Sequence, residues 1–226
     1  ASLDKFKTDI DGFPPPTFAF ADTDDKYISQ QKRVGLSPKV TYKNGSFQIN
    51  AAYTKIDRET ISAFGSTNEA DSYVVDAFNK YNFSDTFYTI VGLNYGYYKS
   101  LFSEEESFTN TDPYLNVVYV SDFGLNINAG GRLNNHSEYG SHFVYNLNPS
   151  FSIPVKDGYA KLFSSYATSF IAPNLSQLFG FFGPNPDLKP ELISEFEVGF
   201  DARLWKNRIS LDVSYFDRAT DDLIVF

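Results

Sequence analysis

Apolar and polar residues alternate one by one along several long stretches of this chain, among them 124–134, 143–153 and 194–204. This period of two is typical of a β-strand that has one apolar and one polar face. Strands in soluble proteins average about 5–6 residues, whereas a strand that crosses a lipid bilayer needs about 9–11. The length of the alternating stretches therefore favours strands that span a membrane.

The segments between the alternating stretches are short and long in turn. The first short one is the Asn-Gly pair at 44–45, which is a strong signal for a β-hairpin turn. Outer-membrane barrels have short periplasmic turns and longer extracellular loops, whereas a β-sandwich has little reason to keep that order. We predict strands near 27–42, 46–56, 69–81, 86–100, 113–120, 124–134, 143–155, 159–170, 193–205 and 208–218, short turns at 44–45, 82–85, 121–123, 156–158 and 206–207, and long loops at 57–68, 101–112, 135–142 and 171–192, with the leader 1–26 in the same order.

The predicted fold class is all-β, a transmembrane antiparallel up-and-down β-barrel of which about ten strands are present. With lipid outside the barrel, the apolar side chains of each strand face hydrocarbon and the polar ones face the lumen. In 194–204 the predicted lipid-facing residues are Phe196, Val198 and Phe200, and the predicted lumen-facing ones are Glu195, Glu197 and Arg203. The tyrosines predicted to lie in the headgroup layer are Tyr95, Tyr97, Tyr98, Tyr114 and Tyr119.

Composition narrows the classes of site and of partner. The chain has no cysteine, which excludes disulfides and thiolate metal sites. Its formal net charge of −9, without a cluster of lysines and arginines, argues against a nucleic-acid partner. The absence of methionine indicates a processed or truncated piece. Aromatic residues make up 18% of the chain, which fits either a soluble β-sandwich core or the aromatic girdles of a membrane barrel.

Longer motifs resemble one family. The stretch "SYATSFIAPNLSQLFGFFGPNPDLKPELISEFEVGF" at 165–200 resembles the TonB-dependent outer-membrane receptors. Within it, "APNLSQLFGFFG" is similar to the vitamin B12 (cobalamin) transporter branch, as is "GGRLNNHSEYGSHF" at 130–143. The final "SYFDRATDDLIVF" resembles the strand that follows in those receptors. Residues 1–112 match only in the rhythm of strands and loops.

The resemblance implies a barrel of about 22 strands around an N-terminal plug, in the bacterial outer membrane. Nothing in the chain is similar to the plug, to the segment that contacts TonB, or to the last strands of such a barrel. We therefore expect residues 1–226 to be a central part of the barrel domain, with 1–26 as an extracellular loop and 27–218 as strands and loops.

The same resemblance implies a transporter and not an enzyme. Such a receptor binds a scarce nutrient at its extracellular loops and imports it with energy coupled through TonB. Cobalamin is the first-choice ligand and a ferric siderophore is the alternative. The implied partners are the small-molecule ligand, TonB acting through the missing plug, the lipid of the outer membrane and a surface lipoprotein.

The predicted loop 171–192 contains a short amphipathic turn that is rich in aromatic residues. Aromatic faces suit a flat ring system of the corrin type, and an exposed apolar cluster at this place fits ligand contact. The alternative is that these side chains pack under the loop and fix its shape. The candidate ligand-binding residues are Asn174, Gln177, Phe179, Phe181 and Phe182.

Several carboxylates gather in the leader, where a Pro-rich bend could bring them together. Calcium takes about 6–8 oxygen ligands, although the spacing here is not that of an EF-hand loop. From the residues alone, a solvated acidic loop is the better reading. The resemblance implies a structural calcium site, since acidic loops at this place bind calcium in the cobalamin branch. The candidate ligands are Asp9, Asp11, Asp22 and Asp24, with Asp57 from the next long loop.

Two alternatives come from other classes of protein. Small outer-membrane proteases and phospholipases are barrels of similar length, and they need a Ser-His or Asp-His constellation at the loop end. Ser141 and His142 come nearest, but adjacency in sequence does not make a catalytic pair. His136 and His142 are the two histidines, and histidines in a polar loop are more often solvated than metal-bound. A soluble sugar-binding β-sandwich would be distinguished by folding without detergent.

Overall fold

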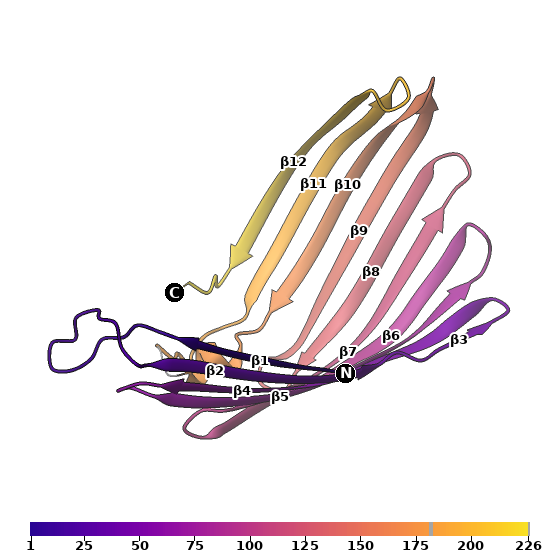
Figure 1. The fold of residues 1–226 in the computed structure, drawn as a ribbon. Helices are drawn as coiled ribbons and strands as arrows, with labels where there is room; N and C mark the ends of the chain where they lie inside the picture. Colours follow the sequence, from indigo (N-terminus) through magenta and orange to yellow (C-terminus); the bar gives the residue numbers. More distant parts are fainter. Residues whose placement is uncertain (181–182, 226) are drawn as a thin grey trace.

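The computed structural model describes residues 1–180 and 183–225, which form one antiparallel sheet (Figure 1). Each strand pairs with its neighbour along the chain, except that β2 and β3 both pair with β4. One short helix, α1, lies between β10 and β11. The elements are β1 (Ser2–Asp9), β2 (Lys26–Leu36), β3 (Lys39–Tyr42), β4 (Gly45–Ile61), β5 (Ser66–Asn82), β6 (Phe87–Leu101), β7 (Glu105–Val120), β8 (Leu125–His136), β9 (Gly140–Val155), β10 (Gly158–Ile171), α1 (Leu175–Phe179), β11 (Glu191–Leu204) and β12 (Ile209–Asp221).

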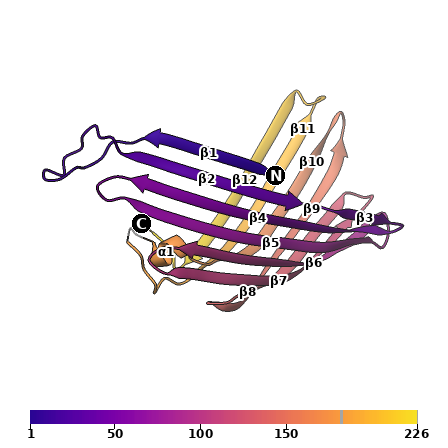
Figure 2. The same ribbon diagram turned by 60° about the horizontal axis from the view of Figure 1, so that its bottom comes forward.

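The sheet is curved and open, with β1 at one edge and β12 at the other (Figures 1 and 2). Its up-and-down antiparallel order confirms the predicted fold class. An open edge inside lipid would leave backbone N–H and C=O groups without partners, at a cost of several kcal/mol each. In a membrane this sheet can therefore be only part of a closed barrel.

The number of strands and the start of the sheet differ from the prediction. Within the described residues there are twelve strands, because the leader 1–26 is not a loop throughout. Its first part is β1, which pairs with β2 from Ser2↔Arg33 to Asp9↔Lys26. The predicted strand 27–42 is divided into β2 and β3 around Pro38, which has no N–H to donate to a ladder.

Three of the predicted long loops are also mostly strand. The connections that replace 57–68, 101–112 and 135–142 are only 62–65, 102–104 and 137–139. The sequence signal that suggested loops was polar composition, but polar residues still pair in a ladder when the strands extend beyond the membrane into water. Only the connections 10–25 and 172–190 are long.

The two faces of the sheet have the predicted polarity. We call the face that carries α1 the inner face and the opposite one the outer face. On β11, Phe196, Val198 and Phe200 lie on the outer face with exposed fractions of 40%, 36% and 38%, while Glu197 points to the inner face. Among the described residues, the buried apolar side chains are Pro173, Leu175, Leu178, Ile193 and Ala202. Large apolar side chains are therefore exposed on the outer face and not packed into a core, as in a barrel that faces lipid.

A row of tyrosines crosses the outer face near its loop end. The rings of Tyr53 and Tyr73 are stacked at 4.7 Å between centroids, and Tyr97 follows at 6.1 Å. Such a row is typical of the membrane interface, where a phenol keeps its hydroxyl among the headgroups. Two of the predicted headgroup tyrosines, Tyr98 and Tyr114, lie instead on the inner face, because neighbouring residues of a strand point to opposite sides.

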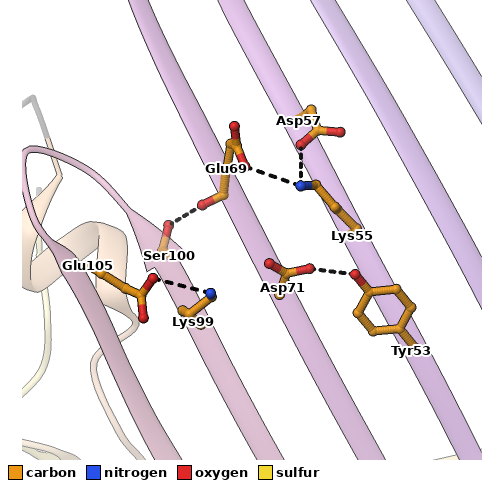
Figure 3. Close-up of polar contacts among 8 residues, drawn as sticks. All are labelled: Tyr53, Lys55, Asp57, Glu69, Asp71, Lys99, Ser100 and Glu105. Atoms are coloured by element: carbon orange, nitrogen blue, oxygen red, sulfur yellow. Dashed lines mark hydrogen bonds and ion pairs between the residues drawn. The ribbon is translucent and has the colours of Figure 1, made fainter.

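Beyond the tyrosine row, the outer face changes from apolar to charged (Figure 3). Lys55 forms ion pairs with Glu69 at 3.2 Å and Asp57 at 3.4 Å, and Lys99 pairs with Glu105 at 3.2 Å. Charged side chains at this level are stable only in water or among headgroups, so the tyrosine row marks the end of the lipid-facing zone. No helix of the described residues is long and apolar enough to cross a membrane.

Candidate ligand site at the loop end of the sheet

The helix α1 begins with a capping box made by two of the predicted ligand-binding residues. The backbone N–H of Gln177 donates to the Asn174 side-chain oxygen at 3.0 Å, and the backbone N–H of Asn174 donates to Gln177 Oε1 at 2.8 Å. These reciprocal bonds satisfy N–H groups that the first turn of a helix leaves without partners. The structure therefore assigns Asn174 and Gln177 a role in shaping the loop, and their contact with ligand stays a prediction.

The loop 172–190 is held against the inner face by burial and by hydrogen bonds. Leu175 and Leu178 have exposed fractions of 8% and 5%, and Pro173 is fully buried. The Tyr139 hydroxyl donates to the carbonyl of Leu188 at 3.1 Å, which ties the end of this loop to the β8–β9 turn. Figure 2 shows α1 at the loop end of the sheet, and α1 contacts β7. The loop is therefore docked on the inner face and does not extend freely into solvent.

Two pockets lie beside α1, each lined partly by residues of the docked loop and partly by the strands or turns next to it. One, of about 320 Å³, lies between Asn174–Ser176 and the inner residues of β4–β7. The other, of about 240 Å³, lies between the 102–104 turn and a wall that includes Phe179 and Pro184. Asn174 and Phe179 thus line pockets of a size suited to part of a small molecule. The other two predicted residues, Phe181 and Phe182, lie outside the described residues.

A further pocket, of about 280 Å³, opens where β7, β8 and β10 approach the loop end. His136 stacks on Phe108 at 4.6 Å, and Phe108 lies 5.0 Å from Tyr98. None of the lining side chains is Lys, Arg, Asp or Glu. They are Tyr98, Phe108, Asn110, Asn134, His136, Phe170, Ile171 and Ala172.

His136 was expected to be a solvated loop residue, and this was wrong. It is the last residue of β8 and only 4% exposed, and burial lowers the pKa of its imidazole because the charged form is disfavoured there. The alternation of polar and apolar residues in β8 could have predicted this position, since Asn134 and His136 continue the polar face to the end of the strand. Sequence analysis also missed Tyr98 and Phe108 as inner-face residues.

The predicted calcium ligands do not form a metal site in this arrangement. Among residues 1–180 and 183–225, no three His, Cys, Asp or Glu side chains are grouped closely enough to hold a metal ion. Asp57 on β4 pairs with Gln30 of β2, whereas Asp9 on β1 pairs with Lys26 of β2. The two aspartates are therefore about 13 Å apart along the direction of β2, on strands that flank it on opposite sides. The loop 10–25 is shaped by backbone bonds such as those between Gly12 and Ala21. Calcium therefore stays a prediction for Asp9, Asp11, Asp22 and Asp24, and for the more distant Asp57.

Protease digestion of the full-length protein checks the calcium prediction. If calcium draws the carboxylates of loop 10–25 together, it should slow cutting within residues 13–20, and EDTA should restore the faster cutting. Magnesium is the control for ionic strength and divalent charge, because it dehydrates reluctantly and needs stricter geometry. The same rate in calcium and in EDTA would remove calcium from the account of this loop.

The nearest candidate for a catalytic pair is separated by the fold. Ser141 and His142 are neighbours on β9 and therefore point to opposite faces of the sheet. The Ser141 hydroxyl donates to the Asn135 side chain, while His142 Nε2 lies 3.0 Å from the carbonyl oxygen of Tyr139. This serine has no histidine to act as its base, so the geometry gives no support to the hydrolase alternative.

Solved structures of similar fold include three receptors. The siderophore receptor PirA from Pseudomonas aeruginosa matches 86% of this chain and 39% of its own, with a TM-score of 0.71 and 18% identity. A mutant of the ferric enterobactin receptor PfeA from the same species matches 87% and 35%, with a TM-score of 0.72 and 14% identity. The hemophore receptor HasR from Serratia marcescens, in complex with its hemophore and heme, matches 88% and 40%, with a TM-score of 0.68 and 17% identity.

At these identities the likeness concerns the fold alone, and this chain spans 40% or less of each of those three chains. The sequence itself matches a family description, "TonB dependent receptor-like, beta-barrel", over residues 2–226. That match agrees with the lipid-facing outer surface, the tyrosine row and the docked loop described above. The chain belongs to the TonB-dependent receptor β-barrel family, whose members lie in the bacterial outer membrane.

Proposed function

We propose that this chain forms part of the barrel of an outer-membrane transporter that binds a scarce nutrient at its extracellular end and imports it with TonB-coupled energy. The observation that carries the proposal is the docked loop 172–190, which covers pockets on the inner face just above the tyrosine row. A ligand held there lies outside the hydrocarbon layer and at the mouth of the barrel. No bond of the ligand needs to be made or broken in this role.

Cobalamin is the proposed ligand. The pocket beside His136 is lined by aromatic rings and amides, without a charged side chain, and this suits an uncharged ligand with a flat ring and amide groups. A strongly anionic iron chelate would be expected to meet lysines or arginines, which pair with charged oxygens, and Arg58 lines the neighbouring pocket of about 320 Å³. The alternative is a ferric siderophore, supported by the printed names of PirA and PfeA.

The energy source and the protein partners belong to the proposal too. TonB would act through a plug in the lumen of the barrel, and the plug would be the moving part. The residues of this chain would supply contacts that hold the ligand until the plug moves. A surface lipoprotein is a proposed additional partner at the extracellular loops, and the lipid of the outer membrane surrounds the outer face.

Titration of the full-length protein in detergent tests the ligand. We expect saturable binding of cobalamin, and no comparable binding of a ferric catecholate siderophore or of heme at the same concentrations. Repeating the cobalamin titration with calcium and with EDTA shows whether the loop 10–25 contributes. Saturable binding of the siderophore or of heme, without binding of cobalamin, would replace cobalamin as the substrate and leave the transporter class standing.

A further inference from the structure

Two buried polar atoms at the loop end have no partner within the part of the chain that the structure describes. They are Nε2 of His136 and Oδ1 of Asn110. The two residues are direct neighbours across β7 and β8, and both line the pocket of about 280 Å³. A buried polar group without a hydrogen bond costs about 1–3 kcal/mol, and buried polar groups are nearly always satisfied. Something outside these residues is therefore expected to bond to both atoms.

The donor and acceptor roles of the two atoms are opposite. The backbone N–H of Glu138 donates to His136 Nδ1 at 3.1 Å, so Nδ1 is an acceptor and the proton of the neutral imidazole is on Nε2. The lowered pKa of His136 agrees with a neutral ring. His136 Nε2–H thus offers one donor, and the Asn110 side-chain oxygen offers one acceptor.

The side chains that line the pocket around this pair are mostly flat and uncharged, and the buried carboxyl group of Asp112 lies close enough to His136 and Tyr98 to act on both electrostatically. Phe108 stacks on the His136 ring with the two planes 30° apart, which fixes the direction of the Nε2–H bond. Tyr98 and Phe170 line the pocket with them. A group that satisfies both atoms must therefore carry one acceptor and one donor, and a small planar group suits the aromatic walls.

We propose that this pocket binds a carboxamide group of the transported ligand, whose carbonyl oxygen accepts from His136 Nε2–H and whose N–H donates to Asn110 Oδ1. A carboxylate has only acceptors and leaves Asn110 unsatisfied, and an ammonium group has only donors and opposes the imidazole N–H. The pocket has room for one side arm and not for a whole macrocycle. The inference deepens the proposed function and rests on it for the identity of the ligand.

Small probes test the chemistry without assuming the ligand. In the full-length protein labelled with ¹⁵N-histidine, we expect propionamide to shift the His136 Nε2 resonance saturably, and propionate and propylamine at equal concentrations to leave it unchanged. Replacing Asn110 with leucine keeps the size of the side chain and removes the acceptor, so it should weaken the propionamide response. A propionate response equal to that of propionamide, or no propionamide response, would overturn the inference.

Cobalamin binding provides the second readout. We expect His136→Phe, which keeps the stacking on Phe108, and Asn110→Leu each to weaken binding about 3- to 10-fold, as for the loss of one hydrogen bond. The double variant should lose less than the product of the two effects, because both side chains hold one group. The matched control is His142→Phe: His142 does not line this pocket, and although it stacks at 4.3 Å on Phe170, which does, phenylalanine keeps a ring for that stacking.

The two readouts separate failure of the inference from failure of the proposed ligand. Propionamide binding without cobalamin binding would keep the carboxamide pocket and reject cobalamin. Cobalamin binding that is weakened no more by His136→Phe and Asn110→Leu than by His142→Phe would overturn the inference and leave cobalamin as the ligand.

Discussion

Replacing Val198 with arginine should strongly impair assembly of the barrel in lipid, while replacing its neighbour Glu197 with arginine should not. Val198 lies on the outer face of β11 between Phe196 and Phe200, where the side chain meets hydrocarbon. An arginine on a lipid-facing position costs up to about 2–4 kcal/mol, the larger value applying at the middle of the bilayer. Glu197 lies on the inner face at almost the same depth. The control therefore introduces the same residue, arginine, and differs only in the face of the sheet on which it stands.

The measurement is the folded fraction after insertion into vesicles, read from the shift between unheated and heated samples on a semi-native gel. We expect the folded fraction of the Val198→Arg variant to fall steeply and that of Glu197→Arg to stay near the unmodified protein. Equal folded fractions for the two variants would mean that the assignment of the faces is wrong. A larger loss for Glu197→Arg would reverse the two faces.

Truncating Leu178 to alanine should release the loop 172–190 without preventing assembly of the sheet. Leu178 is 5% exposed and lies beside the 102–104 turn and Glu106 at the start of β7, and truncation of a buried leucine costs about 2–5 kcal/mol. Because the loop is a local unit on the surface of the sheet, this cost should appear as local opening and not as global unfolding. The opening equilibrium should rise about 30-fold or more, since every 1.4 kcal/mol is a factor of ten.

Hydrogen exchange at the amides of α1 measures this opening. The N–H of Gly180, which donates to Ser176 at 2.9 Å, should lose protection in the Leu178→Ala variant while amides in β6 and β7 keep theirs. Ser176→Ala is the matched control, because Ser176 is exposed and lies on the same helix between the buried Leu175 and Leu178. Unchanged protection at Gly180 would show that burial of Leu178 does not hold the loop, and we would then assign that role to the Tyr139–Leu188 bond.

The sequence was informative wherever a single strand carried the signal. Alternation in 194–204 predicted which side chains of β11 face outward, because a strand fixes the side of every residue once one residue is placed. The prediction failed where polar composition was taken as a sign of a loop. The segments 57–68 and 101–112 are polar and were predicted as loops, yet their backbones pair, since a strand above the membrane needs no apolar side chains to form its ladder.

The site depended on pairing between strands, which a single sequence does not reveal. Nothing in the sequence shows that Asn110 stands opposite His136, because their register follows from the length of the turn and the ladder between β7 and β8. The capping bonds of Asn174 and Gln177 are local, and a capping-box spacing in the sequence could have indicated them.

Local periodicity and local motifs were enough to predict the class of strand, the polarity of the two faces and the family resemblance. Three features became visible only in the folded sheet: β1 extends it, α1 docks on the inner face, and His136 is buried beside the Asn110 side-chain oxygen, which has no partner in residues 1–180 and 183–225. Each of these depends on contacts between residues that are distant in the chain. Their free energy comes from burial and pairing, and neither is present until the sheet has formed.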